Sequence, residues 1–522
     1  MTARIVFQGG PIRTMDPAMP EASAVTIEGS QITRVQAPGA PPPTLRPDDR
    51  LIDLRGRTLL PGLVDAHTHL MHWGFRFLRP GLGGAANRAE VLDRIREAHR
   101  NLPPGRLLLG EGWDESGWPD PGFPTRQELD AIDAGRPMVI RRICGHMAVA
   151  NSAALVHFPA GPDVDPTSGF LLEEASMGIA RIFPPNADEL DQALEAAERS
   201  YLSMGVTQVH DMCLPDHLRS FERAGTDGRL RLSIAAILPR QELDFLVDSG
   251  LGAGWHKGSV RLRGVKFFSD GSLGARTAAL NSAYADRPGE AGALLLDSDA
   301  LARDIARADG AGIPLAIHAI GDRAVAMVIA AFERGLSGRS SRVGHRIEHL
   351  EMVNAAELER VARLGLEASM QPNFVGNWGL PGGLYEQRLG VERTARMNPM
   401  SRVLAAGVRL VVGSDGMPAG VLPGLADAVA APHAAQRLMV DQALAAATRE
   451  AAHSGGFPDR GILRAGNCAD LLVLSGCPPG SAIGHEAAEE LRRARVEMVL
   501  TGGQVAFESL EMNPATARGG KG

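Results

Sequence analysis

The sequence is poor in cysteine and poorer still in lysine. Four cysteines in 522 residues cannot form the disulfide framework of a small secreted protein. Only three lysines occur, Lys257, Lys266 and Lys521, so the positive charge comes almost entirely from arginine. The 54 Lys+Arg and 61 Asp+Glu residues give a net charge of −7. Such a chain lacks the basic excess of a nucleic-acid-binding protein, and no nucleic-acid partner is expected.

Long apolar runs are also missing. No stretch of about 18 apolar residues occurs, so no membrane span is expected. The N-terminal segment MTARIVFQGGPIRTM lacks an apolar core of signal-peptide length. These two absences predict a cytoplasmic protein. Apolar residues nevertheless make up 44% of the chain, which is enough for a large globular core.

The middle of the chain alternates between apolar runs and Ala-rich helical stretches. Near-continuous apolar runs are typical of buried parallel strands, and their alternation with helices predicts a parallel sheet. Eight strand–helix units fit a closed (β/α)₈ TIM barrel of the α/β class, with a doubly wound open sheet as the alternative. The eight runs are 62–69, 205–212, 230–238, 260–270, 312–322, 345–352, 365–374 and 407–415.

The two ends of the chain differ from this middle part, because both consist of short β-rich runs separated by turns. Residues 1–61 and 455–510 are therefore predicted to form one β-sandwich domain, and 511–522 a disordered tail. The barrel takes 62–454. Within it, about 135 residues separate the first two runs, so 73–190 is predicted to be an inserted lid subdomain.

Five of the eight runs carry a side chain that can bind a metal or move a proton. In a barrel the strand ends converge on one mouth, which predicts a metal site there. Taken singly, each residue has another explanation: a structural histidine, a helix N-cap for the aspartate, or a surface lysine. The residues are His67 and His69 on the first run, Lys266 on the fourth, His318 on the fifth, His349 on the sixth and Asp415 on the eighth.

Lys266 lies in the apolar segment Gly-Val-Lys-Phe-Phe, with no neighbouring carboxylate in the sequence. A buried ammonium group is costly and tends to lose its charge. A neutral lysine amine can react with CO₂ to give a carbamate, an anion that can bridge two metal ions as a carboxylate does. The alternative is a lysine that pairs with a carboxylate of the substrate.

Several motifs, in order along the chain, resemble the metal-dependent amidohydrolase superfamily. PGLVDAHTHL resembles its first-strand motif. More narrowly, the sequence is similar to the YtcJ-like branch, which includes N-substituted formamide deformylases. The segments that carry this similarity are GWDESGWPDPGFPTRQELDA, GHMAVANSAAL, VKFFSDGSLGARTAAL, IHAIGDRAV, RIEHLEM, LYEQRLG with RMNP, and GNCADLLVLS.

The resemblance implies a (β/α)₈ barrel, a β-sandwich built from both termini, and two divalent metal ions, usually Zn²⁺. The implied ligands are His67 and His69 for the more buried metal, a carboxylated Lys266 as the bridge, His318 and His349 for the more exposed metal, and Asp415 for the buried metal. The lysine carbamate requires CO₂. Because relatives are often dimers, the resemblance also implies a homodimer.

The implied reaction is hydrolysis of a C–N bond in a small-molecule amide, formamide or cyclic amide. A metal-activated hydroxide attacks, and Asp415 is both a ligand and the general base. A deaminase, an ester hydrolase, an isomerase or a non-catalytic binding protein on the same scaffold remains the alternative. Predicted substrate-binding residues, with fold support as the competing role, are Trp113, Asp114, His146, Asn151, Asp270 and Arg276.

Overall fold

The computed structural model describes residues 4–509 except 104, 121 and 253. The predicted disordered tail lies outside these residues. The chain divides into two compact units, one of which is Met71–Ala197, while the other contains the residues before and after it. Among the described residues, no helix is long and apolar enough to cross a membrane.

The larger unit contains a parallel barrel, as predicted. Its strands follow one another in chain order around the sheet, and each overlaps one of the eight apolar runs. A short antiparallel strand, β13 (His256–Lys257), pairs with the fourth of them. The barrel strands are β6 (Leu63–Thr68), β11 (Val206–Met212), β12 (Ser233–Pro239), β14 (Val260–Phe268), β15 (Leu315–Ala319), β16 (Arg346–His349), β17 (Glu367–Met370) and β18 (Leu410–Val412).

The seam between the last and first strands is closed by hydrogen bonds just beyond β18. The backbone N–H of Asp415 donates to the carbonyl of His67 over 2.7 Å. The N–H of Ser414 donates to the Asp65 carboxylate over 2.8 Å. Gly413 permits this approach, because a Cβ there would lie 2.3 Å from the backbone nitrogen of His67. The first and eighth strands are thereby held together at the mouth of the barrel.

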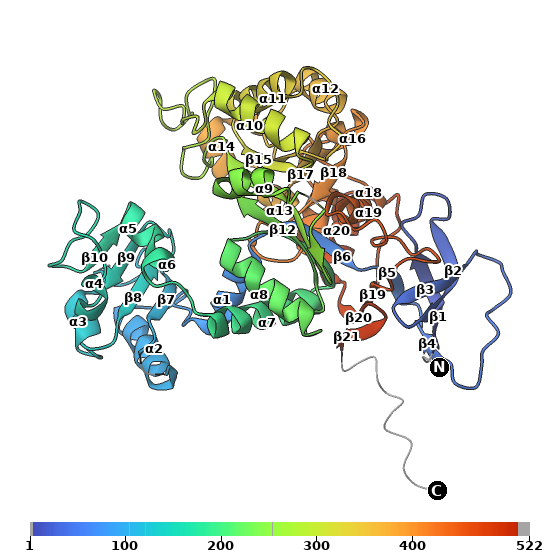
Figure 1. Cartoon of the computed structure of the whole chain (residues 1–522), viewed down its shortest axis with the longest axis horizontal. Helices are drawn as coiled ribbons and strands as arrows, with labels where there is room; N and C mark the ends of the chain where they lie inside the picture. Colours follow the sequence, from blue (N-terminus) through green and yellow to red (C-terminus); the bar gives the residue numbers. More distant parts are fainter. Residues whose placement is uncertain (1–3, 104, 121, 253, 510–522) are drawn as a thin grey trace, which may run out of the picture. The chain divides into compact units, whose positions relative to one another are not determined.

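Helices cover the outside of the barrel, and Figure 1 shows α10, α11 and α12 outside β15. Their starts are encoded locally: Asp297 caps α10 through the N–H of Ala300, and Asn354 forms a capping box with Glu357 at α12. The helices are α8 (Pro215–Thr226), η1 (Arg240–Glu242), α9 (Leu243–Ser249), α10 (Ser298–Gly310), α11 (Asp322–Gly335), α12 (Ala355–Arg363), α13 (Pro372–Trp378), α14 (Leu384–Leu389), α15 (Val391–Thr394), α16 (Met400–Ala405), α17 (Leu422–Val429), α18 (Val440–Ala446) and α19 (Arg449–Ser454).

Both ends of the chain join one eight-stranded mixed sheet, seen in Figure 1 where the blue strands lie beside the red ones. The link between the ends is β5, which pairs antiparallel with β19 from Pro61–Leu471 to Thr58–Leu474. Helix α20 (His485–Arg493) precedes β20. The strands are β1 (Arg4–Arg13), β2 (Glu21–Glu28), β3 (Gln31–Gln36), β4 (Arg50–Asp53), β5 (Thr58–Pro61), β19 (Leu471–Leu474), β20 (Val496–Thr501) and β21 (Gln504–Glu508).

The inserted unit has a four-stranded sheet of its own, in the order β10-β9-β8-β7. Side chains alternate between its faces: Met138 and Ile140 of β8 enter one buried core, and Val139 between them enters another. Both faces of the sheet are thus covered. The elements are α1 (Leu70–Leu78), α2 (Arg88–Asn101), β7 (Leu108–Trp113), α3 (Arg126–Asp130), β8 (Met138–Arg142), β9 (Met147–Ala150), α4 (Ser152–Leu155), β10 (Phe170–Leu172), α5 (Glu173–Met177), α6 (Ile179–Ile182) and α7 (Ala187–Ser203), with the unit borders inside α1 and α7.

Candidate active site

The mouth of the barrel holds a cavity of about 340 Å³. All six residues predicted to bind metal lie on its walls, although they are spread over almost 350 positions of sequence. They reach it because the carboxyl ends of parallel barrel strands open onto one face. The six are His67, His69, Lys266, His318, His349 and Asp415.

Three of these side chains form a compact donor group. One ligand atom each of His67, His69 and Asp415 can be chosen so that all three lie within 4.8 Å of one another. The Nε2 atoms of His67 and His69 are 3.5 Å and 3.1 Å from Asp415 Oδ1. Two imidazoles and a carboxylate at this spacing are a donor set that suits a divalent transition metal.

His318 and His349 form a second histidine pair beside this group. Their ring centroids are 4.5 Å apart, and His349 lies 4.9 Å from His67. The Nδ1 atom of His349 is 2.7 Å from the side-chain oxygen of Gln371, which leaves Nε2 for a ligand. Burial lowers the pKa of His318 to about 4, and neighbouring Lys266 adds to the shift. The imidazole is therefore neutral near pH 7, the form that binds metals.

Lys266 is buried on β14, with only 4% of its surface exposed. Its ammonium nitrogen lies 5.1 Å from the ring centroid of Phe268. Burial lowers the pKa of the Lys266 amine to about 8, while the carboxylates of Glu348 and Asp415 oppose that shift. An amine with this pKa is uncharged in a substantial fraction of molecules at neutral to mildly basic pH, as carbamate formation requires.

Glu348 is a buried residue of this site that the sequence did not single out. Its Oε2 atom lies 2.5 Å from Nδ1 of His67, on the side of the ring opposite Asp415. Arg346 lies 2.5 Å from its other oxygen. Burial alone would raise the pKa of Glu348. The positive charges of Arg346 and Lys266 outweigh this effect and lower the pKa below its usual value, so the group is a carboxylate. Glu348 thus fixes the tautomer of His67, with the proton on Nδ1 and a lone pair on Nε2.

The backbone is strained where two of the ligands leave their strands. His349 has a φ of 70° and Asp415 a φ of 55°, in the left-handed region that non-glycine residues seldom occupy. Such residues cost free energy and persist where the surrounding structure holds them, frequently at functional sites. Here both turns direct side chains into the cavity.

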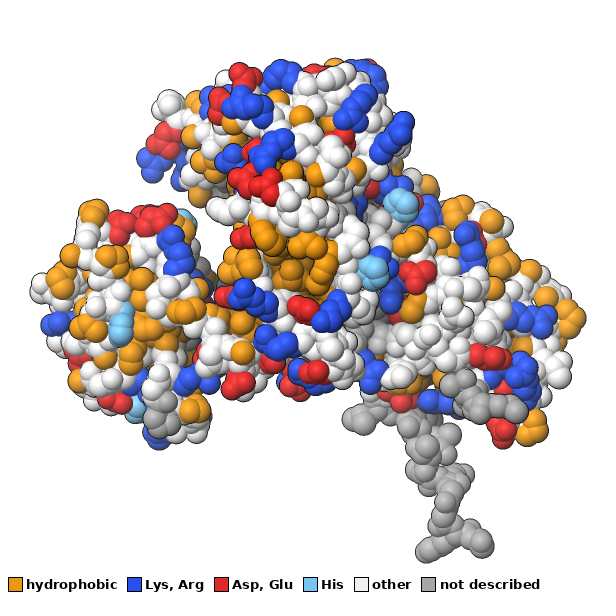
Figure 2. All heavy atoms as spheres, in the orientation of Figure 1, with side chains coloured by type: hydrophobic (Ala, Val, Ile, Leu, Met, Phe, Trp, Pro, Cys, Tyr) orange, Lys and Arg blue, Asp and Glu red, His pale blue; other side chains and the backbone are white. Residues whose placement is uncertain are grey.

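The wall of the cavity above the metal-binding side chains is largely apolar. Figure 2 shows hydrophobic side chains gathered in the area where Figure 1 labels α13 and β12. Phe268 and Met417 are half-exposed. Glu351 is the acidic residue in this part of the wall, and burial raises its pKa to about 7. The apolar lining residues are Phe268, Leu273, Ile320, Phe374, Trp378, Leu384 and Met417.

Asp270 and Arg276 were predicted to contact the substrate. Asp270 is buried, and its carboxylate accepts N–H bonds from Ala279, Ile320 and Gly321. Its Oδ1 atom is 3.4 Å from His318. The carboxylate therefore supports the turn that follows His318 at the end of β15. Arg276 instead forms a two-pronged pair with Asp286 near the surface.

The other four predicted substrate contacts lie in the inserted unit. Trp113 and Asn151 are fully buried there. Both side-chain atoms of Asn151 bond to backbone groups, which is a structural role. Asp114 accepts the N–H of Ser116, and exposed His146 lies 2.8 Å from Glu173.

Comparison with known proteins agrees with this geometry. The sequence model of an amidohydrolase family matches residues 50–507. The chain belongs to this amidohydrolase family. Among curated proteins it is 29% identical over 508 residues to the putative amidohydrolase YtcJ of Bacillus subtilis, covering 88% of this chain and 91% of that protein. It is 27% identical to the N-substituted formamide deformylase of Arthrobacter pascens, covering 94% and 96%.

Solved structures of metal-dependent hydrolases have a similar fold. An uncharacterized metal-dependent hydrolase from Pyrococcus furiosus superposes with a TM-score of 0.79 at 28% identity, covering 91% of this chain and 99% of that one. The predicted resemblance and barrel fold are thus confirmed. This amidohydrolase belongs to a metal-dependent superfamily of hydrolases and deaminases that act on small molecules.

Proposed function

We propose that this amidohydrolase cleaves the C–N bond of a small-molecule amide, formamide or cyclic amide with two divalent cations, Zn²⁺ first among them. The observation that carries the proposal is the set of six side chains on one cavity wall, with donors of His67, His69 and Asp415 within 4.8 Å of one another. Imidazole nitrogens with few carboxylates favour zinc over magnesium or calcium.

The residues present fit a two-metal centre. His67, His69 and Asp415 would hold one cation, and His318 with His349 the other. When bound, the cations would lower the pKa of a water and polarise the substrate carbonyl. His67 is already oriented for this by the carboxylate of Glu348 on its Nδ1 side.

Lys266 completes the donor set as a carbamate. Its uncharged amine nitrogen forms a bond to the carbon of CO₂ and releases one proton, so a neutral amine becomes an anion. Starting from the ammonium, two protons are released in all. This change removes the cost of a buried cation among imidazoles. An arginine could not react in this way, which gives a reason for lysine at this position of an arginine-rich chain.

Asp415 moves the proton. Its Oδ1 atom faces the histidines from the loop after β18, where it can accept a proton from the attacking water and return it to the leaving nitrogen. The apolar wall excludes bulk water and suits an apolar substituent on the amide. The similarity to an N-substituted formamide deformylase supports the same bond type.

The inserted unit is proposed to act as a lid. It begins at Met71, two residues after His69, and therefore leaves the barrel at the carboxyl end of β6. Insertions at this end of a barrel surround active sites, and lids exclude water during the reaction.

The test is product analysis by mass spectrometry, with a panel of N-substituted formamides, N-acyl amines and cyclic amides in ¹⁸O-labelled water. We expect a free amine and an acid that carries one ¹⁸O, or a ring-opened product that carries it. Asp415→Asn should lower kcat by about 10³-fold with the fold retained. The matched control is Asp299→Asn, an exposed aspartate on α10 that should keep full activity. A product of unchanged mass, or an active Asp415→Asn enzyme, would contradict the proposal.

A further inference from the structure

The inserted unit contains a second kind of cavity, which the hydrolase chemistry does not use. It has a volume of about 810 Å³ and lies between α1, the end of β7 and the turn after β8. Its charged lining is unusual because four arginines face one glutamate. We name it the arginine cavity, after Arg76, Arg79, Arg141 and Arg142; the glutamate is Glu111.

Two of these arginines compete for a single oxygen atom. Arg79 is 3.1 Å from Oε1 of Glu111, and Arg141 pairs with the same Oε1. Both guanidinium groups are about four-fifths buried. Burial lowers the pKa of Arg79, and the neighbouring cation of Arg141 opposes the stabilising effect of Glu111. The charge of Glu189 also acts on Arg79, but Glu189 is paired with Arg106. Three arginines thus share two carboxylates, and one positive charge is left uncompensated.

The other two arginines of the cavity, Arg142 and Arg76, differ in their interaction partners. Arg142 is held by Glu115, which lies outside the cavity lining, through both Nε and a terminal nitrogen. Arg76 forms no ion pair among the described residues and is exposed. Its guanidinium carbon lies 4.9 Å from the ring centroid of Trp73, which orients it without neutralising it. Arg76 and one of the pair Arg79 and Arg141 are therefore free to take an anion.

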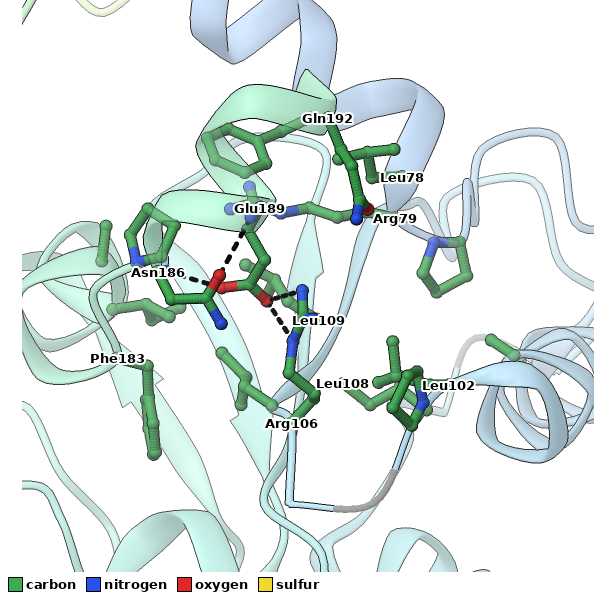
Figure 3. Close-up of a pocket in the computed structure, with 18 of the residues that line it drawn as sticks. Leu78, Arg79, Leu102, Arg106, Leu108, Leu109, Phe183, Asn186, Glu189 and Gln192 are labelled. Carbon is green, nitrogen blue, oxygen red and sulfur yellow. Dashed lines mark hydrogen bonds and ion pairs between the residues drawn. The ribbon is translucent and has the colours of Figure 1, made fainter. Parts of the chain in front are cut away.

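A neighbouring cavity of the same unit has a smaller excess of arginine in its lining. This cavity, of about 660 Å³, is drawn in Figure 3. Its Arg106 pairs with Glu189, with 2.5 Å between Nε and Oε1, and the charge of Glu189 also raises the pKa of Arg79. The labelled leucines and Phe183 add apolar surface to the wall, and Asn186 and Gln192 add uncharged polar groups. Arg79 lines both cavities, so the second has two arginines for one glutamate and the first has four for one.

We propose that the arginine cavity binds a small organic anion with two negative charges, through the oxygen pair that a carboxylate and a phosphate group share. Guanidinium groups bind such oxygen pairs in a two-pronged geometry that lysine cannot reproduce. One charged end would meet Arg76, and the other would meet Arg79 and Arg141. The site is independent of the reaction assigned to the barrel.

The test is isothermal titration calorimetry of the full-length metal-loaded protein at low ionic strength. Succinate and inorganic phosphate are the anionic probes, and succinamide is an uncharged probe of the same size as succinate. We expect saturable binding of an anion and none of succinamide. Tighter binding of phosphate than of succinate would assign the site to phosphate compounds, and the reverse to dicarboxylates. Equal binding of succinamide and succinate would overturn the proposal.

Two variants with opposite expected effects on anion affinity test whether the anion binds in the arginine cavity. Arg76→Gln, at an exposed position, should weaken the anion at least tenfold without unfolding the protein. Glu111→Gln removes the competing carboxylate and should tighten binding severalfold, an outcome that a purely structural role for Glu111 does not produce. Arg96→Gln, an exposed arginine of α2 paired with Asp93, is the control and should change nothing. An affinity unaffected by both Arg76→Gln and Glu111→Gln would place the anion elsewhere, for example at the barrel metals, and would overturn the proposal.

Discussion

The barrel mouth and the arginine cavity are two polar sites built in opposite ways. At the barrel mouth, imidazoles and carboxylates lie at strand ends, so the site presents nitrogen lone pairs and negative charge to a cation. In the arginine cavity, guanidinium groups from a helix and a strand outnumber their carboxylate, so the site presents charge to an anion. The comparison predicts that donor type and charge balance, more than burial, decide what each cavity binds.

The supports of the two sites differ as well. At the barrel mouth two of the donors have a partner behind them, Glu348 behind His67 and Gln371 behind His349. In the arginine cavity, Arg76 rests on an aromatic face alone. Removing such a partner should sharply lower the affinity of the barrel mouth for metal. Replacing Arg76, by contrast, should weaken anion binding and leave the stability of the protein unchanged.

The largest expected effect tests whether the inserted unit is stable by itself. Asn151→Ala removes a buried side chain that accepts from Met138 and Ala154 and donates to Asp133 and Arg136. The loss should destabilise the inserted unit by about 3 kcal/mol, because several buried backbone groups are left unpaired. Hydrogen exchange followed by mass spectrometry should show faster exchange in the inserted unit and unchanged exchange in the barrel strands.

The control for this change is Asn87→Ala, in the same unit. Asn87 is also a helix N-cap, but it is exposed and accepts one bond, from Glu90. Its replacement should cost about 1 kcal/mol. Equal effects of the two variants would contradict the larger role of the buried Asn151. Faster exchange in the barrel as well would show that the two units do not unfold separately.

The next prediction tests the role of Glu348 at the barrel mouth. Glu348→Gln keeps the size of the side chain but removes the charge that holds the Nδ1 proton of His67. Metal affinity should fall tenfold to a hundredfold, as for other partners of metal-bound histidines. Competition with a fluorescent zinc chelator measures this. Glu359→Gln, at a surface position of α12, is a control, and equal affinities of the two variants would contradict the positioning role.

The last prediction concerns the pH dependence of stability and a buried histidine outside the ligand set. The Nδ1 atom of His345 accepts the N–H of Leu315, and burial lowers the pKa of His345 to about 4. In the unfolded chain its pKa is about 6.5. The unfolded state therefore binds the extra proton between these values, and stability falls by about 1.4 kcal/mol per unit as pH drops from 6.5 toward 4.

His345→Asn keeps an acceptor for Leu315 but cannot titrate. Urea unfolding at several pH values should therefore show a shallower loss of stability on the acid side than in the unmodified protein. An identical slope would mean that His345 is protonated in the folded state and would contradict the neutral, buried state.

Much of this fold could be predicted from the sequence, because each barrel strand is a compact apolar run with a helix after it. The strand-end position of His318 or Asp415 also followed from such a run. Glu348 could not be found in this way. It stands next to His349 in the sequence, but its partner is His67, 281 residues away, and the contact depends on the closure of the barrel.

The arginine cavity left even less trace in the sequence. Arg76 and Arg79 lie one turn apart on or beside α1, and Arg141 and Arg142 end β8 more than 60 residues later. In a chain whose cations are nearly all arginine, no spacing marks these four. Only the pairing of β7 with β8 brings Glu111 opposite Arg141.

The central claim is that the barrel mouth holds two cations bridged through Lys266. The most direct test is elemental analysis of protein purified with bicarbonate present throughout, for the unmodified chain and for Lys266→Ala. We predict about two equivalents of zinc or a similar metal per chain in the first and one or fewer in the second. A single equivalent in the unmodified protein, or two equivalents retained by Lys266→Ala, would contradict the bridged centre.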